Sequence, residues 1–183
     1  MNSINRLKLF NTQIVADTGD IDLIKKYQPL DVTTNPSLIL SICKEEKYKH
    51  LLSNDLEETL VNFGSEIYKE VEGYVSTEVN PKYSYDTEKT IELALKIIYL
   101  YEKKNIDKNR ILIKIASTWE GIRAAETLEK DYNIKCNMTL IFSLEQAIEC
   151  AEAKVTLISP FVGRIDDWYK KNKPEIKIDM GVE

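Results

Sequence analysis

The stretch ILIKIA, residues 111–116, predicts a β-strand that carries a lysine in its middle. Side chains alternate between the two faces of a strand, so its three isoleucines share one face while Leu112, Lys114 and Ala116 share the other. We expect the isoleucines to pack against covering helices, which points Lys114 into the interior of the fold. The other strands of the fold should offer side chains that suit the same interior.

Short apolar runs alternate with longer helical patterns along the chain, and this alternation indicates an α/β fold with a parallel sheet. The predicted strands are residues 14–17, 31–35, 74–79, 111–116, 137–142 and 155–159. Such a sheet is either open and doubly wound or closed into a barrel. Each strand offers a polar or charged residue that could share the interior with Lys114, which favours a barrel with a central site at the carboxyl ends of its strands.

Two helix starts directly follow predicted strands. Ser117-x-x-Glu120 and Ser143-x-x-Gln146 both match the capping box, a pattern in which serine and a glutamate or glutamine satisfy each other's backbone N–H groups. A helical segment over residues 45–72 is predicted to break at residues 53–55.

The composition is that of one globular domain and limits the class of function. The 183 residues include 25 basic and 30 acidic ones and no basic stripe, so we expect neither nucleic acid nor a membrane as partner. The N-terminus lacks the apolar core of a secretory signal, and no apolar run approaches the ~20 residues that span a bilayer. Three cysteines without C-x-x-C spacing fit a reducing cytoplasm, and the single histidine, His50, argues against a metal site.

Lys114 is the leading candidate for chemistry. A lysine ammonium buried without a partner is costly and loses its proton readily, and a neutral amine attacks carbonyl groups. Glu78 ends the preceding strand, and neighbouring strands lie ~4.8 Å apart. Glu78 could therefore form a purely structural ion pair with Lys114. It could equally transfer protons, directly or through a water held by Thr139. The spacing leaves both interpretations open.

Other polar residues near predicted strand ends have similar alternatives. Asp17 could be a helix cap or a catalytic carboxylate. Asn35 and Asn137 could form loop hydrogen bonds or recognise the hydroxyls of a polyol substrate. Arg164, near a predicted helix start, could bind a phosphate group or lie on a solvated surface.

Long motifs give the chain a resemblance to a known family: it is similar to transaldolases of the bacterial and eukaryotic cytosolic type. The matching motifs are VADTGDIDLIKKYQPLDVTTNPSLIL (15–40), STEV (76–79), SYDTE (84–88), RILIKIASTWEGIRAAETLEK (110–130) and CNMTLIFSLEQAIECAEAKVTLISPFVGRIDDWY (136–169).

The resemblance implies a (β/α)8 TIM barrel of the class I aldolase type and a reaction without a cofactor. A dihydroxyacetone unit would move from a ketose phosphate to an aldose phosphate in the non-oxidative pentose phosphate pathway. Lys114 matches the Schiff-base lysine, and Glu78 would shuttle protons through a water held by Thr139. Asp17 would take the proton of the C4 hydroxyl as the C3–C4 bond breaks.

The resemblance also implies substrate-binding roles and a homodimer. Asn35 and Asn137 would bind donor hydroxyls, while Ser159 and Arg164 would lie on the phosphate side. Related proteins often form homodimers, so self-association is a further expectation.

Two departures from the family pattern affect these expectations. The region between residues 40 and 74 is shorter than usual, which predicts a trimmed surface helix. After Arg164 we find one helix start and the weak run Ile176-Lys177-Ile178, but no seventh or eighth strand. Residues 1–183 are thus expected to form a single, incomplete barrel domain of six βα units, whose unpaired edges invite self-association or completion by another chain. The alternatives are an inactive fragment that acts as an assembly module and a fructose 6-phosphate aldolase-like enzyme, which would release free dihydroxyacetone.

Overall fold

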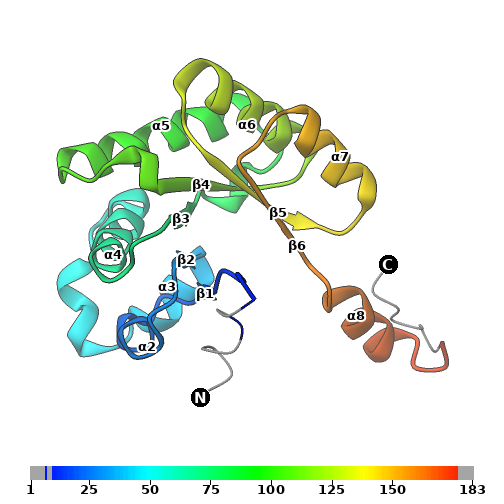
Figure 1. The fold of residues 1–183 in the computed structure, drawn as a ribbon, viewed down its shortest axis with the longest axis horizontal. Coiled ribbons are helices and arrows are strands. Elements are labelled where there is room, and N and C mark those ends of the chain that lie inside the picture. The colour runs from blue at the N-terminus through cyan, green and yellow to red at the C-terminus, as the bar shows by residue number, and fades with distance from the viewer. Residues whose placement is uncertain (1–6, 8–9, 177–183) are drawn as a thin grey trace.

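Six parallel strands form one curved sheet in the computed structural model, which describes residue 7 and residues 10–176 (Figure 1). The strands lie side by side in chain order: β1 (Val15–Asp17), β2 (Asp31–Thr33), β3 (Val75–Glu78), β4 (Ile111–Ala116), β5 (Cys136–Ile141) and β6 (Leu157–Pro160). All six predicted strands are therefore confirmed, and together they make the half-barrel expected for six βα units. Lys177 and Ile178 of the weak C-terminal run lie outside the described residues.

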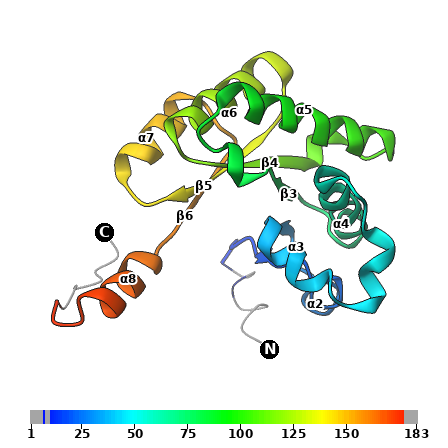
Figure 2. The same cartoon turned by 180° about the vertical axis from the view of Figure 1, so that it is seen from behind.

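Helices follow the strands and cover the convex side of the sheet (Figures 1 and 2). They are α2 (Ile21–Tyr27), α3 (Pro36–Ile42), α4 (Leu56–Glu70), α5 (Thr87–Lys103), α6 (Trp119–Tyr132), α7 (Leu144–Glu152) and α8 (Arg164–Asn172), with short 3-10 helices η1 (Glu46–Leu51), η2 (Pro81–Tyr83) and η3 (Lys108–Arg110). Helix α8 extends away from the sheet and buries none of its residues. Within the described part of the chain, no helix is both long and apolar enough to cross a membrane.

Strand β4 lies in the middle of the sheet, and all six of its residues are buried. Ile111, Ile113 and Ile115 belong to the hydrophobic core that the sheet shares with the helices. Leu112 and Lys114 are buried outside that core. The predicted division of this strand into an apolar outer face and an inner face with a lysine is confirmed.

The capping box predicted at Ser117 and Glu120 is wrong, because the N-cap of α6 is the next residue, Thr118. Thr118 caps α6, because its hydroxyl accepts the N–H of Gly121 at 3.0 Å. Ser117 instead extends the pairing of β4 with β5, donating its N–H to the carbonyl of Thr139 at 2.8 Å. The ladder therefore fixes the backbone of Ser117 before the helix begins. The predicted cap at Ser143 is confirmed, since its hydroxyl accepts from the N–H of Gln146.

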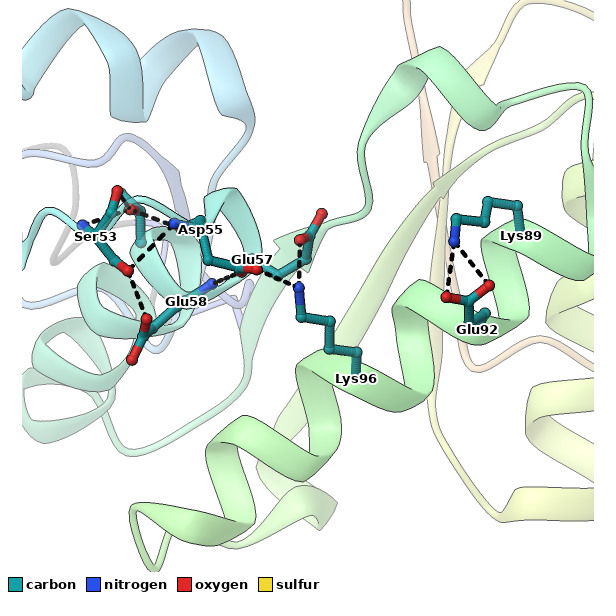
Figure 3. Close-up of polar contacts among 8 residues, drawn as sticks. Ser53, Asp55, Glu57, Glu58, Lys89, Glu92 and Lys96 are labelled. Atoms are coloured by element: carbon teal, nitrogen blue, oxygen red, sulfur yellow. Dashed lines mark hydrogen bonds and ion pairs between the residues drawn. The ribbon is translucent and has the colours of Figure 1, made fainter.

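An ion-pair cluster joins α5 to the start of α4 (Figure 3). The ammonium of Lys96 binds Asp55 at 2.5 Å and Glu57 at 2.9 Å. Asp55 also caps α4, while the side chain of Glu57 is only 10% exposed. The hydrogen bond from Lys96 holds the pKa of the Asp55 carboxyl below its ordinary value of 3.8. The cluster thus helps to fix two helices behind β3 and β4.

Replacing Lys96 with methionine should lower the free energy of unfolding by about 1 kcal/mol, since one partly buried cation serves two carboxylates. Lys89→Met is the matched control, because it removes an exposed pair with Glu92 in the same helix. The control should leave stability nearly unchanged, because the solvent screens an exposed pair. Urea denaturation at neutral pH measures both changes.

The stabilisation by Lys96 should also depend on pH in a defined direction. A carboxyl whose pKa is depressed in the folded state contributes stability above its unfolded pKa and loses it as the pH falls through the folded value. The difference between the unsubstituted protein and Lys96→Met should therefore shrink below pH 3.8. Equal stability losses for the two lysine variants would contradict the role given to the cluster.

Candidate active site

Strand register brings three polar residues into one row on the concave side of the sheet. Glu78 of β3 lies directly opposite Lys114 of β4, which in turn lies directly opposite Asn137 of β5. Because directly opposed residues on parallel strands point to the same face, their side chains share one neighbourhood. Glu78 is the last residue of β3 and Lys114 lies in the second half of β4, toward the carboxyl ends where parallel barrels place their chemistry, whereas Asn137 is the second residue of β5.

The amine of Lys114 makes one hydrogen bond and one ion pair. Its Nζ donates to the backbone carbonyl of Thr34 at 3.2 Å and lies 3.6 Å from Oε2 of Glu78. The side chains of Lys114 and Glu78 are only 7% and 12% exposed. Sequence reasoning identified the glutamate but missed Thr34, because a carbonyl acceptor is supplied by the backbone and leaves no signal in the residue type.

Burial raises the pKa of the Glu78 carboxyl above its ordinary value of 4.5. The charge and hydrogen bond of Lys114 oppose this rise, and the nearby carboxylate of Asp17 adds to it. Asp17 itself is exposed at the end of β1, and Asp20 rather than Asp17 caps α2. The structure therefore excludes the helix-cap interpretation of Asp17 and leaves its carboxylate on the Glu78 side of the site.

A second set of hydrogen bonds crosses the sheet through Asn137, on the same face as Lys114. Asn137 donates from Nδ2 to the hydroxyl of Ser76 at 3.1 Å and accepts at Oδ1 from the hydroxyl of Ser159 at 2.8 Å. Asn137 is almost completely buried. Its amide thus ties β5 to β3 and β6, and its orientation is fixed by both partners.

A pocket of about 230 Å³ opens over Lys114. Five of the predicted site residues line it: Lys114, Glu78, Thr139, Asn35 and Arg164. The other predicted residues, Asp17, Asn137 and Ser159, lie outside its lining. The pocket therefore brings together Lys114, Glu78 and Thr139 with one of the two residues predicted to bind hydroxyls, Asn35, and one of the two predicted on the phosphate side, Arg164.

The pocket residues contributed by loops have additional contacts. Asn35 caps α3, because its Oδ1 accepts the N–H of Leu38 at 2.9 Å. The structural interpretation of Asn35 is thus confirmed, and the same side chain also borders the pocket. The guanidinium of Arg164 is exposed and stacks on the ring of Phe161 at 4.3 Å.

Thr139 supplies an unpaired hydroxyl. The residue is almost completely buried, and its Oγ1 has no hydrogen-bond partner among the described residues. Buried polar groups are normally hydrogen-bonded, so an isolated hydroxyl on a pocket wall indicates a position for a ligand or a water molecule.

A larger hollow of about 660 Å³ lies at the other ends of the strands. It is lined by residues 11–14 and 28–30 together with Glu70 and Glu72, and lacks Lys114. Because chemistry in parallel barrels belongs to the carboxyl ends of the strands, we assign the candidate site to the smaller pocket. Within the described ranges, no cluster of His, Cys, Asp or Glu is arranged to hold a metal ion.

Comparisons of the sequence with known proteins identify the family of the chain. A profile of the family described as Transaldolase/Fructose-6-phosphate aldolase matches residues 14–183. Transaldolase of Glaesserella parasuis is 55% identical over 190 residues, covering 94% of this chain and 60% of that protein. Transaldolase of Saccharomyces cerevisiae is 52% identical over 189 residues (93% and 56%), and probable transaldolase of Drosophila melanogaster is 50% identical over 197 residues (98% and 59%).

The chain spans 56–60% of the length of these relatives. The alignments, at 189 to 197 positions, are longer than the 183 residues of the chain, so the relatives carry residues that this chain lacks within the matched region. The family profile nevertheless covers residues 14–183, which is the whole sequence from the first strand onward. The chain therefore belongs to the transaldolase/fructose-6-phosphate aldolase family.

Proposed function

We propose that the chain carries the Schiff-base site of a transaldolase. The observation that supports this most directly is the position of Lys114, buried on a pocket wall with Glu78 3.6 Å from its amine. The donors would be fructose 6-phosphate or sedoheptulose 7-phosphate, and the acceptors would be glyceraldehyde 3-phosphate or erythrose 4-phosphate. The reaction belongs to the non-oxidative pentose phosphate pathway and needs no cofactor.

The first half of the reaction forms the Schiff base. Glu78 takes a proton from the ammonium of Lys114, and the neutral amine attacks the C2 carbonyl of the ketose. The carbinolamine then loses water, with Glu78 returning the proton through a water held by the hydroxyl of Thr139. The raised pKa of Glu78 suits this role, because a carboxyl that titrates closer to neutral pH transfers protons in both directions more readily.

The second half breaks and remakes a carbon–carbon bond. Asp17 takes the proton of the C4 hydroxyl, the C3–C4 bond breaks, and the protonated Schiff base accepts the electron pair. The aldose leaves, and the enamine that remains on Lys114 adds to the aldehyde of the acceptor, whose oxygen takes the proton back from Asp17. Water then hydrolyses the Schiff base and releases the new ketose phosphate. Asn35 and Asn137 bind donor hydroxyls, while Ser159 and the bidentate guanidinium of Arg164 hold the phosphate.

The cellular setting and assembly follow as part of the same proposal. We place the protein in the cytoplasm, which agrees with its three free cysteines, Cys43, Cys136 and Cys150. We also propose that the chain self-associates. The exposed Val15 on β1 and Leu157 on β6, the two outer strands of the described sheet, support this proposal.

Fructose 6-phosphate aldolase activity is the second candidate, because the matching family profile covers both activities. The two reactions share the lysine chemistry and differ in the fate of the three-carbon unit. An aldolase releases free dihydroxyacetone from fructose 6-phosphate, whereas a transaldolase retains the unit until an acceptor arrives. Measuring free dihydroxyacetone with and without erythrose 4-phosphate distinguishes them.

Borohydride reduction of the protein in the presence of fructose 6-phosphate should leave a three-carbon adduct on Lys114. Peptide mass spectrometry locates the adduct. Lys114→Met should abolish labelling, because no other lysine lines the pocket among the described residues. Lys82→Met, which removes a lysine beside the pocket residue Pro81, should be labelled like the unsubstituted protein. Absence of an adduct on folded protein would contradict the proposal for this chain.

Glu78→Gln should slow adduct formation roughly 10²- to 10⁴-fold, the usual contribution of a proton-transfer group. In the unsubstituted protein the rate should fall as the pH drops through the pKa of Glu78, because only the carboxylate accepts a proton. That acid limb should lie above pH 4.5, since burial raises this pKa, and it should be absent from Glu78→Gln. Trapping with cyanoborohydride across the pH range measures both profiles. An identical acid limb in the variant would assign it to another group.

A further inference from the structure

Strand β5 contains an irregularity at the pocket. Leu140 has a φ of 60°, in the left-handed region that non-glycine residues rarely adopt. The register with β6 shifts at the same place: Thr139 pairs with Ser159, but Ile141 pairs with Pro160. Leu140 is therefore the extra residue of a β-bulge.

The bulge changes which side chains face the site. Met138 and Ile141 both belong to the hydrophobic core, although strict alternation would place residues 138 and 140 on that face. Leu140 lines the pocket instead, next to Thr139. The extra residue thus delivers two consecutive side chains to the Lys114 pocket while Ile141 returns to the core.

One side chain from α7 binds the backbone of the bulge, of the residue that follows β5 and of the residue that follows β4. Gln146 donates from Nε2 to the carbonyl of Leu140 at 3.2 Å and to the carbonyl of Ser117 at 2.8 Å. Its Oε1 accepts the N–H of Phe142 at 2.9 Å. A capping-box glutamine would accept from the N–H of Ser143, so this contact departs from the predicted one.

These contacts replace pairing that the bulge interrupts. The N–H of Ser117 still donates to the carbonyl of Thr139 before the irregularity, whereas the carbonyl of Ser117 is bound by Gln146. The amide therefore satisfies carbonyls at the end of β4 and in the bulge of β5 at once. Gln146 lies outside the pocket lining, so any influence on chemistry passes through the backbone that it holds.

We propose that Gln146 is a positioning residue, which holds the Leu140 bulge so that Thr139 and Leu140 line the pocket of Lys114. The inference rests on the proposed Schiff-base function for its consequence in catalysis. Its structural part, the dependence of the bulge on Gln146, stands independently of that function.

The test compares Gln146→Leu with Ser143→Ala. The first variant removes all three bonds to the bulge and to β4, whereas the second removes only the helix cap of α7. At equal fractions of folded protein, Gln146→Leu should slow adduct formation on Lys114 roughly 10- to 100-fold, because small displacements of catalytic groups are costly. Ser143→Ala should stay within about twofold, since a helix cap affects stability rather than the pocket. Equal rates for Gln146→Leu and the unsubstituted protein would overturn the proposal.

A rescue variant separates positioning from a general loss of stability. Asparagine tolerates the left-handed conformation better than leucine, so adding Leu140→Asn to Gln146→Leu should restore part of the lost rate. A loss caused by a weakened α7 would not be rescued in this way. A double variant no faster than Gln146→Leu would contradict the positioning role.

A measurement without substrate distinguishes failure of the proposed Schiff-base function from failure of the positioning role of Gln146. Nuclear Overhauser contacts between the methyl groups of Leu140 and the side chain of Phe161, which share the pocket lining, should be present in the unsubstituted protein and lost in Gln146→Leu. If the unsubstituted protein forms no adduct, the proposed function fails, and these contacts decide the role of Gln146. Contacts retained in the variant would overturn it.

Discussion

The buried ion pair of Lys114 and Glu78 is the constraint on which the rest of the site depends. Placing an ammonium on the inner face of a central strand is costly unless a carboxylate and further acceptors lie within reach. The register of β3 against β4 supplies the carboxylate directly opposite the lysine, and the loop after β2 supplies the carbonyl of Thr34. On the other face of β4, the isoleucines pack into the core and stabilise the strand that carries the lysine. The fold therefore holds the amine of Lys114 in place by burying the opposite face of the same strand.

Around this pair, the described part of the sheet carries polar side chains with hydrogen-bond partners and others without. Asn137 is bound by hydroxyls on both sides, so its orientation is determined before any ligand arrives. Thr139, two residues later on the same strand, has a buried hydroxyl without a protein partner among the described residues. Asn137 is a fixed group that preorganises the site, whereas the unpaired hydroxyl of Thr139 is available to a ligand or a water molecule. Both side chains lie on one face of β5, beside Lys114. The bulge that follows Thr139 ends this alternation and returns β5 to the core.

The arrangement of strands and the inner face of β4 could be predicted from sequence, because both depend on hydrophobic periodicity. Glu78 could be predicted as a neighbour of Lys114 for the same reason. The contact with Thr34 could not, since it uses a backbone carbonyl that every residue possesses. The Leu140 bulge could not be predicted either: periodicity assumes that the alternation continues, and a leucine gives no sign of a left-handed conformation. The cap of α6 is predicted at Ser117 but lies at Thr118, because strand pairing extends through Ser117.

The two halves of the proposed reaction use residues from different parts of the sheet, the central strands and the outer strands. Glu78, Lys114 and Thr139 lie on β3, β4 and β5, each of which is hydrogen-bonded to a strand on both sides. Asp17 lies on β1, an outer strand of the described sheet, and Arg164 follows β6, the other outer strand; both side chains are exposed. Strands paired on one side open more easily than strands paired on both, so Glu78, Lys114 and Thr139 lie in the better-ordered part of the described sheet. In the proposed reaction, Schiff-base formation would therefore depend mainly on these central strands, whereas carbon–carbon cleavage and phosphate binding would depend on β1 and on the segment after β6.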